Sequence, residues 1–363
     1  MEFTNEILKK INRKKEKYNG IYAYYYHEMS HEFSDEKKKY SYRSEQINDC
    51  LNLWLWDKYD KNKILDLQKV NRCNSNRFCP NCKLLDISKF IHEFKNRYKE
   101  LAPKGYKAYM LTLTIPSVKG EELRGTLDKL NKTFAKLFKK FAYNSKTRKG
   151  YADRLITIDG GIKVLEITYN HMNGFHPHFH CVVLSKDNLN IDLLEKNIQG
   201  KFSNKRNEYN YKSKIDIQFG KLWSMLWYGD RLTKANIDST VYDPKETYYA
   251  ANKKCLEIDF RELDEKGIYE VFKYTVKDSD IDNYYVFKTL VQSLEGKRIR
   301  QGFGLLLKMQ CENVELGELQ ELELEIEENP TSLLTRKISE LVTTYEKFKK
   351  ISRFQPNIDN AIK

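Results

Sequence analysis

Three histidines fall within five residues of this chain, at His176, His178 and His180, and the apolar run Cys181–Leu184 follows them. Alternate side chains of a β-strand point to the same face, so a strand here would place the three imidazoles side by side. Packing does not account for three imidazoles on one face of a buried strand, whereas neutral imidazole is a common ligand of divalent metals. The triplet therefore predicts a metal site.

A carboxylate on the preceding segment is a candidate for a further ligand. Residues 162–168 are rich in β-branched side chains and predict a strand, and residues 169–175 predict the loop of a hairpin. In that hairpin Glu166 falls opposite Phe179 or one step to either side. A register one step away brings its carboxylate to a histidine, and a metal would then be the partner that a buried Glu needs. A cross-strand salt bridge or a solvent-facing Glu is the alternative.

Two histidines and one carboxylate leave coordination positions open, and a metal with an open position can polarise a substrate oxygen. The charge of the chain favours a phosphate oxygen, because its 363 residues carry a formal net charge of +13 at pH 7. A basic excess of this size indicates a polyanionic partner, most often nucleic acid. A lysine-rich surface from an AT-rich genome would give the same charge.

The apolar content suits two or three structural units with a real core. The longest apolar runs, at 109–116 and 302–309, are too short to span a membrane, and residues 1–19 lack the apolar core of a signal peptide. We therefore expect a cytoplasmic protein without membrane contact, in which cysteines stay reduced.

Four of the seven cysteines predict a second metal site. Cys79 and Cys82 form a Cys-x-x-Cys knuckle, which presents two thiolates to one tetrahedral metal, and Cys50 and Cys73 would complete a structural zinc site. The odd number and the clustering argue against a disulfide framework. A thioredoxin-like redox pair is the rival interpretation, weakened by the additional cysteines and by the lack of a strand-then-helix pattern.

A third group of reactive side chains lies on a predicted helix over residues 264–278. Glu270, Tyr274 and Lys277 fall at i, i+4 and i+7, opposite the apolar stripe that includes Val271 and Phe272. Tyrosine can act as a covalent nucleophile, and a Glu one turn away could accept a proton. With 25 tyrosines in the chain, an exposed one beside Glu and Lys usually has no chemical role, so this position alone does not decide.

Taken in order, these motifs resemble a known family: the rolling-circle replication initiators (Rep) of small bacterial plasmids, within the HUH endonuclease superfamily. Cys50, Cys73 and residues 77–82 match the family's cysteine motif, and residues 111–116 match its first strand motif. Residues 166–170 and 176–180 match its metal hairpin. Residues 270–277 match its tyrosine motif, and residues 296–298 with Gly302 match the segment that follows. The resemblance covers about residues 45 to 305. The combined order and spacing are specific, although each motif alone is not.

The resemblance implies that His178 and His180 are the metal pair, because they flank the single hydrophobic residue Phe179. Glu166 or His176 would then supply the third ligand of a catalytic Mg²⁺ or Mn²⁺, beside the structural Zn²⁺ of the cysteines.

The resemblance also implies an activity. Tyr274 would nick single-stranded DNA at the plasmid origin through a covalent 5′-phosphotyrosyl intermediate, and Glu270 would help a water to end the reaction. Lys277 could neutralise the developing phosphate charge. A host helicase is the partner that the family implies, and the protein would act in the bacterial cytoplasm.

The expected fold is α+β: an HUH-endonuclease-like central antiparallel sheet with flanking helices, an N-terminal cysteine zinc unit and a C-terminal helical tail. The expected divisions are a polar segment over 1–44, the zinc unit over 45–95, the catalytic domain over 100–310, and an acidic segment with an amphipathic tail over 311–363.

Further segments predict single elements. We expect a buried strand over 106–116, amphipathic helices over 121–141 and 331–354, and a short helix over 5–17. The stripe of helix 331–354 could dock on the body or form a homodimer. Residues 203–214 interleave basic and aromatic side chains, which could grip phosphates and stack on unpaired bases, or form a surface loop.

Two other functions fit the same residues. A transposase or conjugative relaxase would use the same tyrosine chemistry on a different DNA end. A non-catalytic, zinc-dependent DNA-binding regulator would need the cysteines but not Tyr274 or His178.

Overall fold

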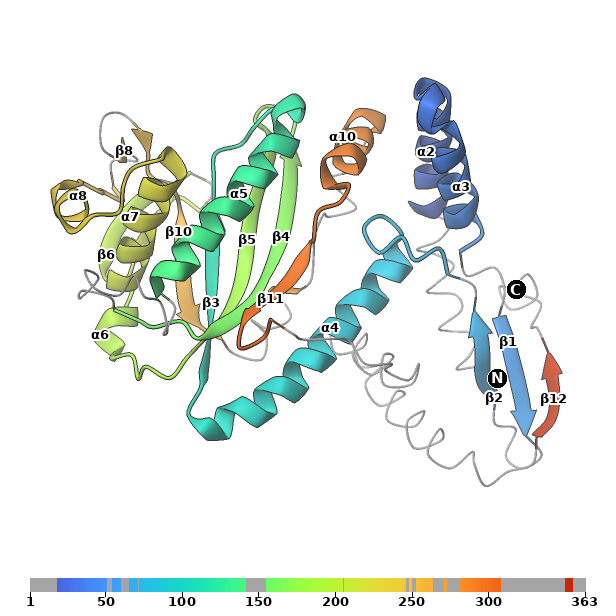
Figure 1. Cartoon of the computed structure of the whole chain (residues 1–363), viewed down its shortest axis with the longest axis horizontal. Helices are drawn as coiled ribbons and strands as arrows, with labels where there is room; N and C mark the ends of the chain where they lie inside the picture. The colour runs from blue at the N-terminus through green and yellow to red at the C-terminus, as the bar shows by residue number, and fades with distance from the viewer. Residues whose placement is uncertain are drawn as a thin grey trace. The chain divides into compact units, whose positions relative to one another are not determined.

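The computed structural model describes residues 18–50, 54–59, 65–70, 72–141, 155–204, 206–245, 248–249, 253–263, 271–272, 281, 283–307 and 350–354. The chain forms two compact units, each of which draws on separate stretches of sequence (Figure 1). The first comprises residues 1–93, 281–288 and 311–363, and the second comprises residues 94–280 and 289–310. Two helices, α4 (Pro80–Leu101) and α10 (Tyr284–Leu294), begin in the first unit and end in the second.

The second unit is built on a five-stranded antiparallel sheet in the order β10-β3-β5-β4-β11. Its strands are β3 (Lys107–Thr114), β4 (Gly160–Asn170), β5 (Gly174–Ser185), β10 (Ile258–Glu262) and β11 (Arg300–Gly304). The predicted strand over 106–116 corresponds to β3. The predicted hairpin is the central pair β4–β5, so the candidate metal ligands lie in the middle of the sheet and not at an edge.

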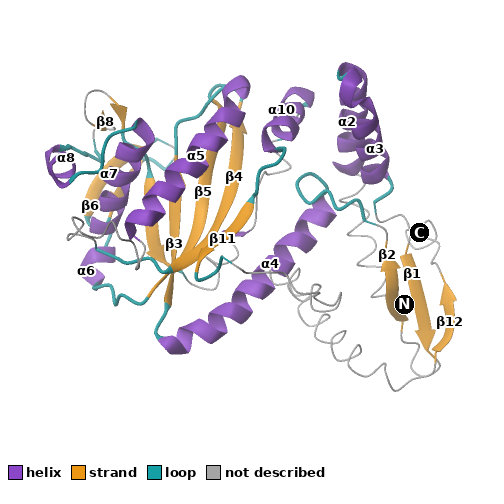
Figure 2. Ribbon diagram, in the orientation of Figure 1, coloured by secondary structure: helices purple, strands orange, loops and turns teal. Residues whose placement is uncertain are grey.

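Helices α5 (Gly120–Phe141) and α7 (Lys214–Tyr228) pack on one face of this sheet (Figure 2). The ring of Phe134 on α5 lies 5.4 Å from that of Phe179 on β5, and Phe219 on α7 stacks on Phe260 of β10 at 5.5 Å. The leucines of α5 that follow helical spacing are fully buried: Leu123, Leu127 and Leu130. Alternate residues of each strand therefore fill this core, and the residues between them face the other side of the sheet.

The turn of the β4–β5 hairpin is shorter than the sequence predicts. We expected a loop over 169–175, but pairing continues to Asn170 opposite Gly174, so only residues 171–173 form the turn. Gly174 has a φ of 79°, in the left-handed region that glycine adopts readily. A Cβ at this position would also lie 2.5 Å from the carbonyl oxygen of Val118, which approaches the hairpin closely.

The first unit contains a helical hairpin that the sequence did not lead us to expect. Helices α2 (Gly20–Glu32) and α3 (Lys37–Asn48) fold from a stretch predicted mostly as a polar segment. Their core is aromatic: Phe287 lies 5.4 Å from the ring of Tyr22 and 5.0 Å from that of Tyr26. The short helix expected over 5–17 lies outside the described residues.

A three-stranded sheet in the order β12-β1-β2 completes the described part of the first unit. It consists of β1 (Trp54–Tyr59), β2 (Leu65–Val70) and β12 (Lys350–Phe354). The last strand corrects the end of the helix predicted over 331–354, because Lys350–Phe354 instead pairs antiparallel with β1, while residues 331–349 lie outside the described residues. An amphipathic pattern does not reveal a strand partner almost 300 residues away.

The remaining elements are short. They are 3₁₀ helices η2 (Ser34–Glu36) and η3 (Ala102–Lys104), helices α6 (Ile191–Leu194) and α8 (Lys234–Ser239), strands β6 (Ile198–Ser203) and β7 (Glu208–Lys212), and the two-residue strands β8 (Tyr248–Tyr249) and β9 (Lys253–Lys254). The mixture of helices with antiparallel sheets confirms the α+β class. Among the described residues, the structure has no helix with the length and hydropathy needed to cross a membrane.

Candidate metal centres

The register of the β4–β5 hairpin brings the predicted carboxylate to the predicted histidines. Glu166 pairs with His178, and Val164 pairs with His180, so the three side chains share one face of the sheet. Oε2 of Glu166 lies 3.3 Å from Nε2 of His178 and 2.8 Å from Nε2 of His180. The three ligand atoms lie within 4.8 Å of one another, close enough to hold one metal ion.

Hydrogen bonds at Nδ1, the ring nitrogen that faces away from Glu166, fix the orientation of the two imidazoles. Nδ1 of His178 lies 3.2 Å from the carbonyl oxygen of His176, and a carbonyl oxygen only accepts, so Nδ1–H is the donor. Nε2 of a neutral His178 is then a bare acceptor that faces a carboxylate oxygen. Two acceptors at this distance need a second ring proton or a cation between them, and a divalent metal fits that requirement.

His180 is oriented by a residue that we did not single out as functional. Its Nδ1 lies 3.1 Å from Oγ1 of Thr112, which is the residue paired with it on β3. Hydrogen bonds to the outer nitrogen of a ligating histidine fix its ring and tune its basicity. The signal for Thr112 was present in the sequence, as a polar residue within the apolar strand over 111–116, but its function depends on the β3–β5 register.

The electrostatics of Glu166 favour its charged form. The side chain is 8% exposed, and burial raises the pKa of its carboxyl group, but its contacts with the imidazoles of His178 and His180 outweigh burial and lower the pKa to about 2. The group is therefore a carboxylate at neutral pH, as a ligand of a hard divalent cation must be.

His176 does not join the three converging side chains. Its ring stacks beside that of His178 at a centroid distance of 5.2 Å, opposite Thr168 on β4. Burial lowers the pKa of this imidazole, which keeps it neutral. Of the two residues that we considered for the third ligand, the geometry therefore favours Glu166, and His176 contributes its backbone carbonyl to the orientation of His178.

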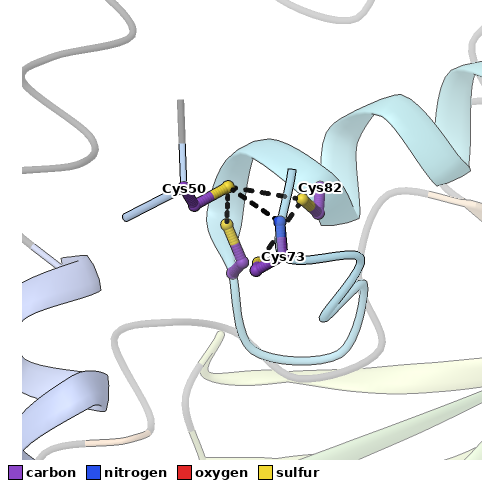
Figure 3. Close-up of side chains that lie close together, drawn as sticks. Cys50, Cys73 and Cys82 are labelled. Atoms are coloured by element: carbon purple, nitrogen blue, oxygen red, sulfur yellow. Dashed lines mark hydrogen bonds between the residues drawn. The ribbon is translucent and has the colours of Figure 1, made fainter. Parts of the chain in front are cut away.

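The four predicted cysteines converge in the first unit, where Figure 3 shows Cys50, Cys73 and Cys82 pointing toward one another. Three of the Sγ–Sγ distances are 3.6 Å: Cys50 to Cys82, Cys73 to Cys82, and Cys50 to Cys79. A disulfide would need about 2.05 Å. Four thiolates about 2.3 Å from a tetrahedral zinc lie about 3.8 Å apart, close to the observed spacing.

The surroundings of the thiols also fit a bound cation. All four side chains are buried, with 5% exposure or less. Backbone N–H groups of Cys73 and Ser75 point to the Sγ atoms of Cys50 and Cys73, at 3.5 and 3.4 Å. Hydrogen bonds from its neighbours lower the pKa of Cys50, whereas the contact with Cys50 raises that of Cys79, because four thiolates cannot share a buried site without a positive charge.

The predicted tyrosine motif is described only at two residues. Val271 and Phe272 are helical and fully buried, as expected for the apolar stripe, and the ring of Phe272 lies 5.9 Å from that of Phe94. Glu270, Tyr274 and Lys277 lie outside the described residues, so their roles stay predictions.

Comparison with known proteins identifies the family. A family model described as a replication protein, Rep_1, matches residues 64–352. This range includes β4 and β5, which carry the candidate metal ligands, and three of the four clustered cysteines. The chain belongs to the Rep_1 replication protein family. This membership confirms the resemblance to plasmid rolling-circle replication initiators that the order of the motifs indicated.

Several curated proteins named protein rep are similar to this chain over most of their length. A protein rep from Bacillus amyloliquefaciens is 26% identical over 77% of this chain and 75% of its own length, and one from a Bacillus species is 26% identical over 78% and 85%. A protein rep from Staphylococcus aureus is 26% identical over 64% of this chain and 82% of its own. No solved structure matches the chain significantly.

Proposed function

We propose that this replication initiator nicks and rejoins one strand of its plasmid origin through a covalent tyrosyl intermediate, and so starts and ends rolling-circle replication. Membership of the Rep_1 family supports the role in replication. The observation that carries the chemistry is the convergence of Glu166, His178 and His180 on one face of the central hairpin.

The three converging side chains would hold Mg²⁺ or Mn²⁺, and the donor set of one carboxylate and two imidazoles suits either ion. A metal bound there would polarise a non-bridging oxygen of the scissile phosphate. Thr112 and the carbonyl of His176 keep the two rings aimed at Glu166, so the ligands are positioned before DNA arrives. The four cysteines would hold a structural Zn²⁺ in the first unit.

Tyr274 is the proposed nucleophile. Its phenol gives up a proton as the phenolic oxygen forms a bond to phosphorus and the bond from phosphorus to the 3′-oxygen breaks. The leaving 3′-oxygen takes up a proton and becomes a 3′-hydroxyl, so one proton is lost and one is gained. The 5′-phosphate stays linked to the tyrosine, so the ester conserves the bond energy and the reverse reaction needs no ATP. Glu270 accepts a proton from water in the terminating hydrolysis, and Lys277 offsets charge on the phosphate.

The test is a covalent-adduct assay on single-stranded origin DNA from the protein's own replicon, labelled 3′ of the nick site. With Mn²⁺, a labelled protein band should form on a denaturing gel, and it should disappear in Tyr274→Phe and without metal. Tyr24→Phe is the matched control, because this tyrosine is 58% exposed and lies on α2.

Two results would change the proposal. An adduct that survives Tyr274→Phe would place the chemistry on another tyrosine. Specific origin binding by the wild type without any adduct would identify a non-catalytic, zinc-dependent regulator instead. The helicase partner and a homodimer would need separate binding measurements.

A further inference from the structure

The β6–β7 hairpin presents a face of exposed aromatic rings that the core does not use. Phe202, Tyr209 and Tyr211 are 40%, 46% and 53% exposed. Phe202 pairs with Tyr209 in the register, with ring centroids 5.1 Å apart, and Tyr211 lies two residues further along the same strand. Rings at alternate positions of a strand share a face, so the three aromatic side chains form one surface, which we call the aromatic face.

A β-bulge creates this surface. Gln199 pairs with Tyr211 and Phe202 with Tyr209, so β6 advances three residues while β7 advances two. A regular ladder would place Phe202 opposite Glu208 and turn its ring to the other side. Gly200 permits the bulge, because a Cβ there would lie 2.4 Å from the carbonyl oxygen of Asn210. Bulges commonly re-aim a side chain at functional positions, and here the bulge adds a third ring to the aromatic face.

The opposite side of the hairpin is tied to the sheet. Nζ of Lys212 donates to the carbonyl oxygen of Ile258 on β10 at 2.7 Å, and Ile258 pairs with Leu113 on β3. Leu113 in turn pairs with Phe179, which stands between the two candidate metal-binding histidines. Ile258, the residue that Lys212 contacts, is therefore two strand spacings, roughly 10 Å, from Phe179, and the hairpin lies one lysine side chain beyond it.

Charge on the hairpin indicates what the aromatic face binds. Residues 198–212 include four basic side chains, at Lys201, Lys205, Arg206 and Lys212, and one acidic side chain, Glu208. Lys201 and Arg206 are exposed, and the guanidinium of Arg206 lies 3.5 Å from the carboxylate of Glu208 and donates to the amide oxygen of Asn210. Exposed rings beside an excess of cations match single-stranded nucleic acid, whose bases stack on aromatic side chains while its phosphates meet lysine and arginine.

We propose that the β6–β7 hairpin binds unpaired nucleotides of the DNA strand that the protein cuts, by stacking bases on Phe202, Tyr209 and Tyr211. Paired bases cannot stack on these rings, so the hairpin selects single-stranded over double-stranded DNA. The identity of the bound strand as origin DNA rests on the proposed function, whereas the stacking surface itself does not.

The experiment measures binding of the full-length protein to labelled (dT)₂₀ and to a 20-base-pair duplex, by fluorescence anisotropy without added divalent metal. Phe202→Ala, Tyr209→Ala and Tyr211→Ala should each weaken binding to (dT)₂₀ about tenfold and leave duplex binding within about twofold. Tyr211→Phe keeps the ring and should retain the wild-type affinity. Tyr24→Ala, an exposed tyrosine on α2, is the matched control.

The basic residues give a second readout. Lys201→Gln and Arg206→Gln should each reduce the slope of log affinity against log salt concentration by about 0.7, the value for one phosphate contact on a single strand. Because Phe202 contacts Tyr209, its loss could loosen the hairpin, and Tyr211→Ala therefore provides the independent test of stacking.

Three outcomes would overturn the inference. The alanine variants could bind (dT)₂₀ as the wild type does, or they could lose duplex and single-strand affinity equally. They could also change the oligomeric state in gel filtration with DNA affinity intact, which would make the aromatic face a contact between copies. If the alanine variants bind DNA normally and still form the tyrosyl adduct, only the proposed role of the hairpin is refuted. If the wild type binds DNA through the hairpin but forms no adduct, only the proposed nicking activity is refuted.

Discussion

Glu166 lies directly opposite His178 in the β4–β5 ladder, and one of its carboxylate oxygens faces both His178 and His180. The three ligand atoms come from adjacent central strands, whose backbone hydrogen bonds fix them relative to one another. A site of this kind is assembled by the fold itself rather than by a mobile loop.

Replacing this carboxylate should weaken metal binding without unfolding the sheet. Glu166→Gln keeps the side-chain volume but removes the charge, and we expect the affinity for Mn²⁺ to fall about 100-fold. Isothermal titration calorimetry with Mn²⁺ measures the change, and Glu195→Gln, an exposed residue before β6, serves as control. Unchanged Mn²⁺ affinity in Glu166→Gln would show that the metal is held elsewhere.

The orientation of His180 should depend on a single hydroxyl group. Thr112→Val removes the partner of Nδ1 with little change in shape, and we expect Mn²⁺ affinity and adduct formation to fall about tenfold. Thr114→Val is a close control on the same strand, because Oγ1 of Thr114 donates to the carbonyl oxygen of Glu257 instead of a histidine. Equal losses in both variants would indicate a general effect on β3 and not an orienting role.

The cysteine cluster should bind one zinc and stabilise the first unit. Cys79→Ser should abolish zinc binding, measured by atomic absorption. It should lower the melting temperature by about 10 °C or more, since each kcal/mol lost costs about 2–4 °C in a chain of this kind. Cys255→Ser is the control, because this half-buried cysteine lies in the second unit, outside the cluster. A wild-type protein without zinc and with the same melting temperature would contradict this expectation.

Lys163 should make stability depend on pH. Its side chain is 7% exposed, its Nζ donates to Oδ1 of Asn131 at 2.5 Å, and it lies over the rings of Phe134 and Phe179. Burial lowers the pKa of this lysine from 10.5 to about 8. Between those two pH values the unfolded chain binds the proton that the folded protein releases, so the free energy of unfolding should rise from pH 8 to pH 10.5.

Lys163→Met should therefore stabilise the protein at pH 7, by up to about 3 kcal/mol, and the advantage should shrink toward pH 10. Urea unfolding at the two pH values measures this difference. Lys201→Met, which replaces an exposed lysine on the β6–β7 hairpin, should show no such trend. A stabilisation of Lys163→Met that is the same at both pH values would mean that burial does not lower the pKa of this lysine, because the folded and unfolded states would then bind the proton equally.

Local patterns were enough to predict the elements that carry their own periodicity. Helix α5 extends over 120–141 against a prediction of 121–141, and the histidine face follows from the two-residue repeat of a strand. The position of Glu166 could be predicted only to within one step, because the register depends on the length of the turn. That turn is three residues long, with Gly174 in the left-handed region.

Elements that depend on distant partners could not be predicted in this way. Helix α2 has no clear apolar stripe in its sequence. Its buried tyrosines pack on Phe287 of α10, more than 250 residues later, and a local pattern does not reveal that partner. Strand β12 pairs with β1 from the other end of the chain. Residues 203–214 gave a composition that suited either nucleic-acid contact or a loop, and only the β6–β7 register shows that the rings share a face.

The contact between Cys50 and the backbone of Cys73 has a consequence for the length of the segment between them. Nitrogen and sulfur lie 3.5 Å apart, so the intervening stretch, which includes β1 and β2, leaves and returns at one point. An excursion whose ends are pinned can gain or lose residues at small entropic cost, because closure entropy grows only slowly with length. A change in the length of this hairpin can therefore leave the thiolate cage intact.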